Sequence, residues 1–255
     1  MVAGMRSTNA RPAPGLGSPD GTGKSALRQL VGGLPSCGGA QREIVPPEPP
    51  VLLSDPRVAA VPVRECEEPL TALGESFGPC RALVRVSVAR RLALARDALP
   101  RGVGLRVVDG YRTAAAQRSI ISSYAAQLRA DHPAIGAAEL ERLSSRFVAP
   151  LAVAPHVAGA AADLTLVDCA GRELDLGTPV DATPEQSEGA CYFDATRVSR
   201  QARANRELLA RVLRGAGLVN YPTEWWHWSY GDRYWALVTG APAALYGPVA
   251  ADQVV

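Results

Sequence analysis

The sequence predicts an α+β fold. Stretches with the three- and four-residue spacing of helices and stretches rich in β-formers follow one another in irregular order. No regular strand–helix–strand repeat is present, which argues against a parallel α/β fold, and there is no internal repeat. With 255 residues, of which 47% are hydrophobic and 20% charged, the chain is long enough to bury a sizeable core.

A mobile extension is predicted over residues 1–50, ahead of a domain over residues 51–248. The first segment is rich in Gly, Pro and Ser and ends in VPPEPP. Such a composition buries too little apolar area to offset the entropy of ordering the chain.

The first elements of the domain are a helix and a strand. In RALVRVSVARRLALARDALP, apolar residues three and four apart predict a helix that ends at Pro100. Its stripe consists of Val84, Val88, Leu92, Ala95 and Leu99. VGLRVVDGYR then predicts a strand that stops at Asp109-Gly110 and leads into a loop.

Two helices and a second strand are expected in the middle of the domain. TAAAQRSIISSYAAQLRA and AAELERLSSRF are typical of helices, and DLTLV of a strand. His132, between the two helices, belongs to no motif and is interpreted as a surface residue.

The last elements are a long helix and a tryptophan-rich strand. TRVSRQARANRELLARVLRGAG places Leu208, Leu209, Val212 and Leu213 on one apolar side, with Gly215 or Gly217 as the stop. WWHWSY then alternates as a strand does. Strict alternation would put residues 224 and 227 on opposite faces, so we expect Glu224 to lie before the strand, in the turn that begins at Pro222.

Charge and cysteine content exclude several classes of partner. The formal net charge is +2, and no basic stripe with interleaved aromatics supports a nucleic-acid partner. No apolar run approaches the roughly 20 residues of a membrane-spanning helix, so no membrane partner is expected.

The five cysteines are widely spaced and form no C-x-x-C pair, which favours a reducing compartment, and the start lacks the layout of a secretion signal. We expect a cytoplasmic protein; LVGGLPSC leaves lipidation as the lesser alternative. The oligomeric state is not indicated.

The stretch PHVAGAAAD is the first candidate metal site. His156 and Asp163 are seven residues apart, with Gly159 and small alanines between them. Imidazole nitrogen and carboxylate oxygen are good zinc ligands, and small residues let the backbone bend so that two ligands converge. Taken alone, the pattern also fits a hydrogen-bonded histidine before an Ala-rich turn.

The stretch YPTEWWHW adds a second histidine and a carboxylate. A catalytic zinc site typically has three protein ligands and an open position, with a carboxylate nearby to take a proton from water. His227 can complete the ligand set, and Glu224 can be the base. The alternative is that His227 packs in a tryptophan core and Glu224 is a solvated charge.

Arg112, just past the strand in VVDGYR, is placed to hold a developing oxyanion, although most arginines are surface residues.

Taken in order, these stretches closely resemble a known family. The order DGYR, H-x-x-G-x-A-x-D-L-T-L, L-G-T-P-x-D, N-R-x-L and E-W-W-H, over about residues 51–235, is similar to the VanX-type D-alanyl-D-alanine dipeptidases. These are zinc D-peptidases related to D,D-carboxypeptidases and to the hedgehog fold. The resemblance implies a single domain with a small, mostly antiparallel sheet flanked by helices.

The resemblance also implies site residues, a cofactor and a reaction. The zinc ligands fall on His156, Asp163 and His227, with one Zn²⁺ per chain. The catalytic glutamate falls on Glu224 and the oxyanion-stabilising arginine on Arg112. Asp181 falls where the family has a residue proposed to meet the substrate amine. The expected reaction is hydrolysis of D-alanyl-D-alanine, or a closely related small dipeptide, in cell-wall metabolism or antibiotic resistance.

Two departures from the family pattern keep alternatives open. Ala154 and Thr113 stand where the family usually has Ser and Pro. The serine is a substrate contact in the family, so Ala154 favours a related metallopeptidase or amidase that acts on another small amide, in antibiotic biosynthesis or peptidoglycan recycling. A non-catalytic zinc-binding domain of the same fold is the third possibility. The presence of both Glu224 and Arg112 argues against it.

Overall fold

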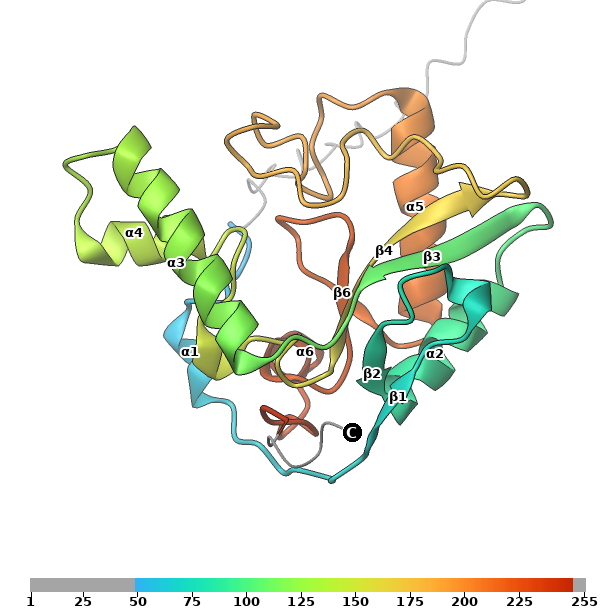
Figure 1. Ribbon diagram of the computed structural model, residues 1–255, viewed down its shortest axis with the longest axis horizontal. Helices are drawn as coiled ribbons and strands as arrows, with labels where there is room; N and C mark the ends of the chain where they lie inside the picture. Colours follow the sequence, from blue (N-terminus) through green and yellow to red (C-terminus); the bar gives the residue numbers. More distant parts are fainter. Residues whose placement is uncertain (1–48, 250–255) are drawn as a thin grey trace, which may run out of the picture. The chain divides into compact units, whose positions relative to one another are not determined.

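The computed structural model describes residues 49–249, which form an α+β domain around a small antiparallel sheet (Figure 1). The four-stranded sheet has the order β3-β4-β6-β5, and each neighbouring pair is antiparallel. Its strands are β3 (Val103–Asp109), β4 (Ala161–Asp168), β6 (His227–Ser229) and β5 (Val219–Asn220). A separate antiparallel pair consists of β1 (Leu70–Ala72) and β2 (Leu83–Arg85). The predicted fold class is confirmed.

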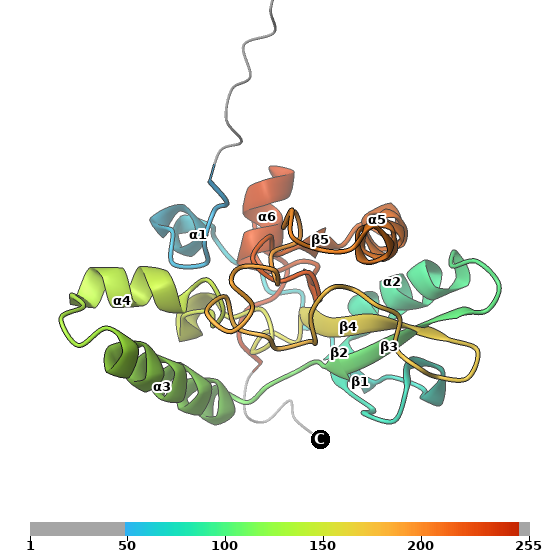
Figure 2. The same cartoon turned by 90° about the horizontal axis from the view of Figure 1, so that it is seen from above.

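Two pairs of helices lie on opposite sides of the domain. In Figures 1 and 2, α3 and α4 lie together, away from α2 and α5, which lie beside β3 and β4. The helices of the described residues are α1 (Pro56–Ala60), α2 (Val86–Asp97), α3 (Ala114–Asp131), α4 (Ala137–Ser144), α5 (Arg200–Gly215) and α6 (Arg233–Thr239). Short 3₁₀ helices cover Glu75–Phe77 and Leu151–Val153.

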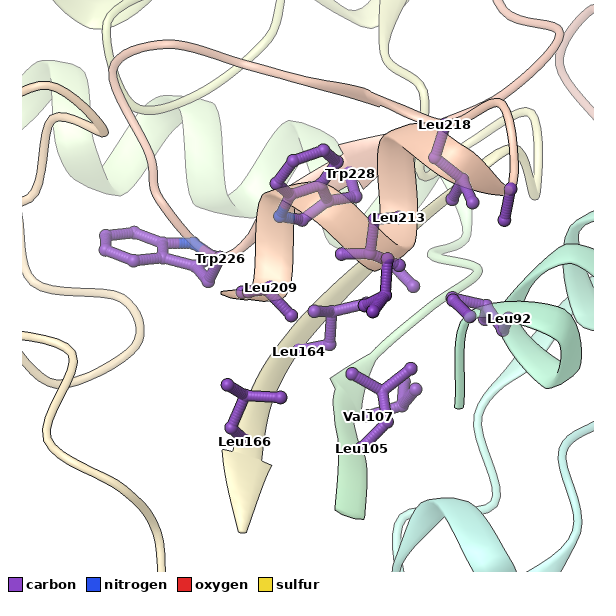
Figure 3. Packing of buried hydrophobic residues seen from close by; sticks show 14 of the residues in the cluster. Leu92, Leu105, Val107, Leu164, Leu166, Leu209, Leu213, Leu218, Trp226 and Trp228 are labelled. Atoms are coloured by element: carbon purple, nitrogen blue, oxygen red, sulfur yellow. The ribbon is translucent and has the colours of Figure 1, made fainter. Parts of the chain in front are cut away.

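The main core lies between the sheet and helices α2 and α5. Figure 3 shows Leu209 and Leu213 of α5 close to Leu164 of β4. Burying each such leucine contributes about 1.5–3 kcal/mol, so this contact holds α5 firmly against the sheet. The same core cluster includes the three tryptophans of the YPTEWWHW stretch, Trp225, Trp226 and Trp228.

Two predicted elements differ from the structure at their starts. Val84 was predicted in the first helix but lies in β2, and α2 begins at Val86. Val84 is fully buried and pairs with Thr71 of β1, a tertiary contact that the apolar spacing of the sequence does not indicate. The strand predicted from residue 225 begins at His227, because Trp225 and Trp226 lie in a turn.

Some expectations concern residues that the structure does not describe. The extension predicted over residues 1–50 and the lipidation motif fall almost wholly outside residues 49–249. The boundary between extension and domain therefore stays a prediction. Within residues 49–249, no helix is both long and apolar enough to cross a membrane.

Candidate metal and active site

Three residues distant in sequence meet because two strands pair. Asp163 of β4 lies directly opposite His227 of β6 in the antiparallel register, and His156 lies in the loop that leads into β4. The His227 Nδ1 atom is 3.0 Å from Asp163 Oδ1, and the His156 Nε2 atom is 3.3 Å from Asp163 Oδ2. The two ring nitrogens, His156 Nε2 and His227 Nδ1, are 3.1 Å apart. All three side chains therefore direct a possible ligand atom to one point.

This arrangement fits a divalent metal such as zinc. One ligand atom from each of the three residues lies within 4.8 Å of the other two. Their exposed fractions are 5% for His156, 2% for Asp163 and 4% for His227, so water competes little for these atoms. Two imidazoles and one carboxylate leave a fourth position open, as in catalytic zinc sites.

The backbone fixes the tautomer of the first histidine. The Nδ1–H of His156 donates to the Gly110 carbonyl at 2.6 Å, which leaves the Nε2 lone pair free for a metal. The loop after His156 turns at Gly159, whose φ is +65°. A Cβ atom there would lie 2.4 Å from Leu70 Cδ2, so only glycine fits this turn.

Glu224 lies beside the three ligand candidates. As expected, it precedes β6 in a turn: its N–H donates to the Tyr221 carbonyl, and its own carbonyl accepts from the His227 N–H. These turns bring the Glu224 Oε2 atom to 3.8 Å from His227 Nδ1. Burial, together with the negative charges of Asp163 and Asp181, raises the pKa of Glu224 well above its ordinary value. The site thus holds a carboxyl group with increased proton affinity.

Arg112 is held at the edge of the same site. Its Nε–H donates to Asp109 at 2.7 Å, and its Nη2 atom is 3.4 Å from Asp163 Oδ2. A backbone hydrogen bond from the Arg112 N–H to the His156 carbonyl, 3.1 Å long, fixes the main chain. Burial opposes the charged form, but Asp163 and Asp109 outweigh it and raise the pKa of the guanidinium. Arg112 therefore stays a cation.

Electrostatic coupling also affects the three ligand candidates. Burial disfavours the charged form of each, but the histidines beside Asp163 outweigh burial and lower the pKa of its carboxyl below the ordinary range. Asp163 in turn raises the pKa of His156. Burial dominates at His227 and lowers its pKa, which favours the neutral imidazole that a metal requires.

The six predicted site residues line one cavity of about 320 Å³. They are Arg112, His156, Asp163, Asp181, Glu224 and His227. The volume is at the lower end for small-molecule sites, so it suits a small ligand. Asp181 lies solvent-exposed at this cavity with φ +63°, and partial desolvation and the charge of Asp163 raise its pKa.

The apolar part of the cavity wall was not predicted from the sequence. It includes Leu53, Ile120, Phe147 and Val148, which come from separate segments of the chain. Ala154 also lines the cavity, where it offers a methyl group in place of a hydroxyl.

Supporting polar residues were missed as well. Asp109 holds Arg112, and Gln117 accepts a bond from Arg112 Nη1 at 3.3 Å while its own amide donates to the Ala149 carbonyl. Asp109 could have been found from the sequence, because it lies in the DGYR motif beside Arg112. Gln117 could not, because it is one polar residue among several in α3. Thr113, the other departure from the family pattern, caps α3 by accepting from the Ala116 N–H.

Comparisons with known proteins show what this chain is similar to. The family model described as D-ala-D-ala dipeptidase matches residues 75–239. A D-alanyl-D-alanine dipeptidase of Synechocystis sp. is 29% identical over 217 residues, 69% of this chain and 87% of that protein. A D-alanyl-D-alanine dipeptidase of Escherichia coli is 36% identical over 98 residues, 38% of this chain and 43% of that protein. A crystal structure of a mutant vancomycin-resistance D,D-pentapeptidase, VanY, in complex with Zn(II) covers 70% of this chain and 86% of its own, with 18% identity and a TM-score of 0.35.

Proposed function

Because the chain belongs to the D-Ala-D-Ala dipeptidase family of metallopeptidases, we propose that it hydrolyses D-alanyl-D-alanine, or a closely related small dipeptide, to free amino acids. One Zn²⁺ per chain is the proposed cofactor, held by His156, Asp163 and His227. The observation that carries this proposal is the buried His–Asp–His group with a further carboxylate and a guanidinium in one small cavity. A site that needed only to hold a metal would require neither of the last two groups.

A zinc ion held by His156, Asp163 and His227 would polarise the scissile carbonyl and make water more acidic. Glu224 accepts the proton of the attacking water on a carboxylate oxygen and later delivers it to the nitrogen of the leaving amine. Burial suits this role, because it raises the pKa of Glu224 and so increases the affinity of the carboxylate for the proton of water.

Arg112 stabilises the oxyanion that develops on the carbonyl oxygen. Asp109 and Gln117 fix the guanidinium before substrate arrives, so little reorganisation is needed during the reaction. This role requires the planar fork of arginine, which holds Asp109 through Nε while its Nη atoms reach Gln117 and Asp163 in the cavity wall.

Replacing Arg112 with lysine is expected to lower kcat about 100-fold, within the range found when one oxyanion donor is removed. An ammonium group retains the charge but cannot bond to Asp109 and the substrate in the same geometry. KM and bound zinc should change little. Steady-state kinetics with metal analysis measures all three, and a kcat within a factor of two of wild type would remove Arg112 from this role.

Asp181 binds the free ammonium group of the dipeptide. Its carboxyl group lies at the cavity and forms no ion pair with another of the described residues; Arg112 acts on it only through the electrostatic field. A pocket that recognises a free amine in this way prefers short free peptides to long chains.

Changing Asp181 to asparagine is expected to raise KM for D-alanyl-D-alanine about 10- to 100-fold, because a charge-assisted hydrogen bond is lost. The value of kcat should change little. An N-acetylated dipeptide lacks the ammonium group, so wild type and variant should treat it alike. Equal KM values for the free dipeptide in the two proteins would contradict the assignment.

A panel of D,D-, L,D- and L,L-dipeptides tests the substrate. The highest kcat/KM is expected for D-alanyl-D-alanine. Ala154, which lines the cavity, favours the alternative of another small amide, and faster turnover of such a compound would support that alternative. Turnover of any of these substrates would exclude a non-catalytic zinc-binding domain.

A further inference from the structure

Asp181 lies in a long loop that must be held in place. Between the end of β4 and the start of α5, residues 169–199 form no helix or strand, as Figure 1 shows. Within it, residues 175–193, here termed the Asp181 loop, bring Asp181 to the cavity. The φ of +63° at Asp181 lies in the left-handed region, which costs more than extended backbone even for aspartate, so contacts elsewhere in the loop help to maintain this conformation.

Arg206 of α5 joins the two ends of the Asp181 loop. The side chain has no exposed surface, and its guanidinium bonds to backbone carbonyls rather than to a carboxylate. Nε donates to Leu176 at 2.7 Å, and Nη2 donates to Ala190 at 2.8 Å. Nη1 donates to Tyr192 at 2.6 Å and to Phe193 at 3.2 Å. One planar group thus connects carbonyls that are 14 to 17 residues apart in the chain.

The neighbouring Asn205 extends this contact by one residue. Its Nδ2 atom donates to the Asp175 carbonyl at 2.7 Å, at the start of the Asp181 loop. Gly177 completes the fit: its φ is +92°, and a Cβ atom there would lie 3.1 Å from Arg206 Nη2 and 2.7 Å from Val198. The positive φ of Gly177 favours glycine at this position, and the absence of a Cβ atom leaves room for Val198 and Arg206.

Arg206 also connects the Asp181 loop to the segment that carries Glu224. Its guanidinium carbon lies 5.8 Å from the centre of the Trp225 ring. Trp225 in turn donates from Nε1 to Thr178 Oγ1 at 2.8 Å and from its backbone N–H to the Cys191 carbonyl at 3.0 Å. Displacing the Asp181 loop would therefore break bonds to α5 and to Trp225.

We propose that Asn205 and Arg206 are positioning residues for substrate binding: they clamp the ends of the Asp181 loop and so hold Asp181 where it meets the amine of the dipeptide. This inference rests on the proposed function for the identity of the ligand. Because the clamp already orders the loop in the free protein, the loop loses less conformational entropy when substrate binds. Loosening it should therefore weaken binding and leave the chemical step almost unchanged.

Asn205→Ala is the principal test, because deleting the wholly buried Arg206 risks the fold. We expect KM for D-alanyl-D-alanine to rise about 10-fold and kcat to stay within twofold of wild type. A tenfold change corresponds to the loss of one hydrogen bond whose net contribution is near the upper end of the usual range. Bound zinc should not change. Hydrogen–deuterium exchange should rise in residues 175–193 and not in residues 161–168 of β4.

A double-mutant cycle with Asp181→Asn distinguishes positioning from general stability. If the clamp acts through Asp181, adding Asn205→Ala to Asp181→Asn should raise KM little further. A lysine side chain cannot span four carbonyls, so Arg206→Lys should behave like Asn205→Ala. Glu207→Gln, on the exposed side of α5, should match wild type in KM and in hydrogen–deuterium exchange of the Asp181 loop.

Additive effects on KM in the cycle, or unchanged exchange in the Asp181 loop of Asn205→Ala, would overturn the proposal. Failure of the proposed function would look different. In that case wild type would hydrolyse no dipeptide, which would remove the role of Asp181, while the exchange data would still decide whether the clamp holds the loop.

Discussion

Replacing Glu224 with glutamine is expected to lower kcat for D-alanyl-D-alanine roughly 10⁴-fold, the upper end of what positioned proton transfer contributes. The amide has nearly the shape of the carboxyl group but cannot accept the proton of water. The other carboxylates that line the cavity have other partners or roles: Asp163 faces both histidines, Asp109 is bonded to Arg112, and Asp181 is the proposed partner of the substrate amine.

The controls separate loss of chemistry from loss of structure. Glu224 is not one of the three ligand candidates, so Glu224→Gln should bind zinc as wild type does and unfold at the same temperature or above. Glu207→Gln, an exposed change of the same kind on α5, should keep full activity. Activity of Glu224→Gln within tenfold of wild type would show that another group moves the proton.

Replacing His227 with alanine is expected to abolish tight zinc binding and, with it, activity. Two of the three proposed ligands would remain, and Asp163 would lose its partner across the β4–β6 pair. A ligand that binds only the folded state raises stability by mass action, about 2.7 kcal/mol at 100 times its Kd. Zinc should therefore raise the unfolding temperature of wild type and have almost no effect on His227→Ala.

His132 offers a matched control for the same substitution. It is exposed at the C-terminal cap of α3, as the sequence predicted for a surface residue. His132→Ala should bind one zinc per chain and show the wild-type thermal shift. If His227→Ala also kept one tightly bound zinc, the ligand assignment would be wrong.

Long elements with a clear period were predictable from the sequence. Helix α5 follows its apolar spacing from the Ser199 cap to Gly215, and β3 ends at Asp109 as expected. The predicted family was confirmed as well, because several motifs in one order are far more specific than any one of them. Short elements such as α1, β1, β5 and α6 have too few residues for a period, and only their tertiary contacts define them.

The chemistry of the site was more predictable than its walls. His156, Asp163 and His227 carry residue-specific signals, since few other side chains can bind zinc. Leu53, Ile120 and Phe147 are ordinary apolar residues in sequence, and only the folded chain brings them to one cavity. Asn205 and Arg206 were noted in the sequence only as part of the N-R-x-L motif. Their contacts could not be predicted, because their partners are backbone carbonyls, which leave no trace in the sequence of the loop.

Release of free D-alanine from D-alanyl-D-alanine by zinc-loaded protein tests the proposed function most directly. Chelated wild type and zinc-loaded Glu224→Gln should be measured beside it. We predict rapid release of two D-alanine molecules per dipeptide by the zinc-loaded wild type and almost none in either control. No release by folded, zinc-bound wild type would contradict the proposal that D-alanyl-D-alanine is the substrate, and equal release after chelation would contradict the metal site.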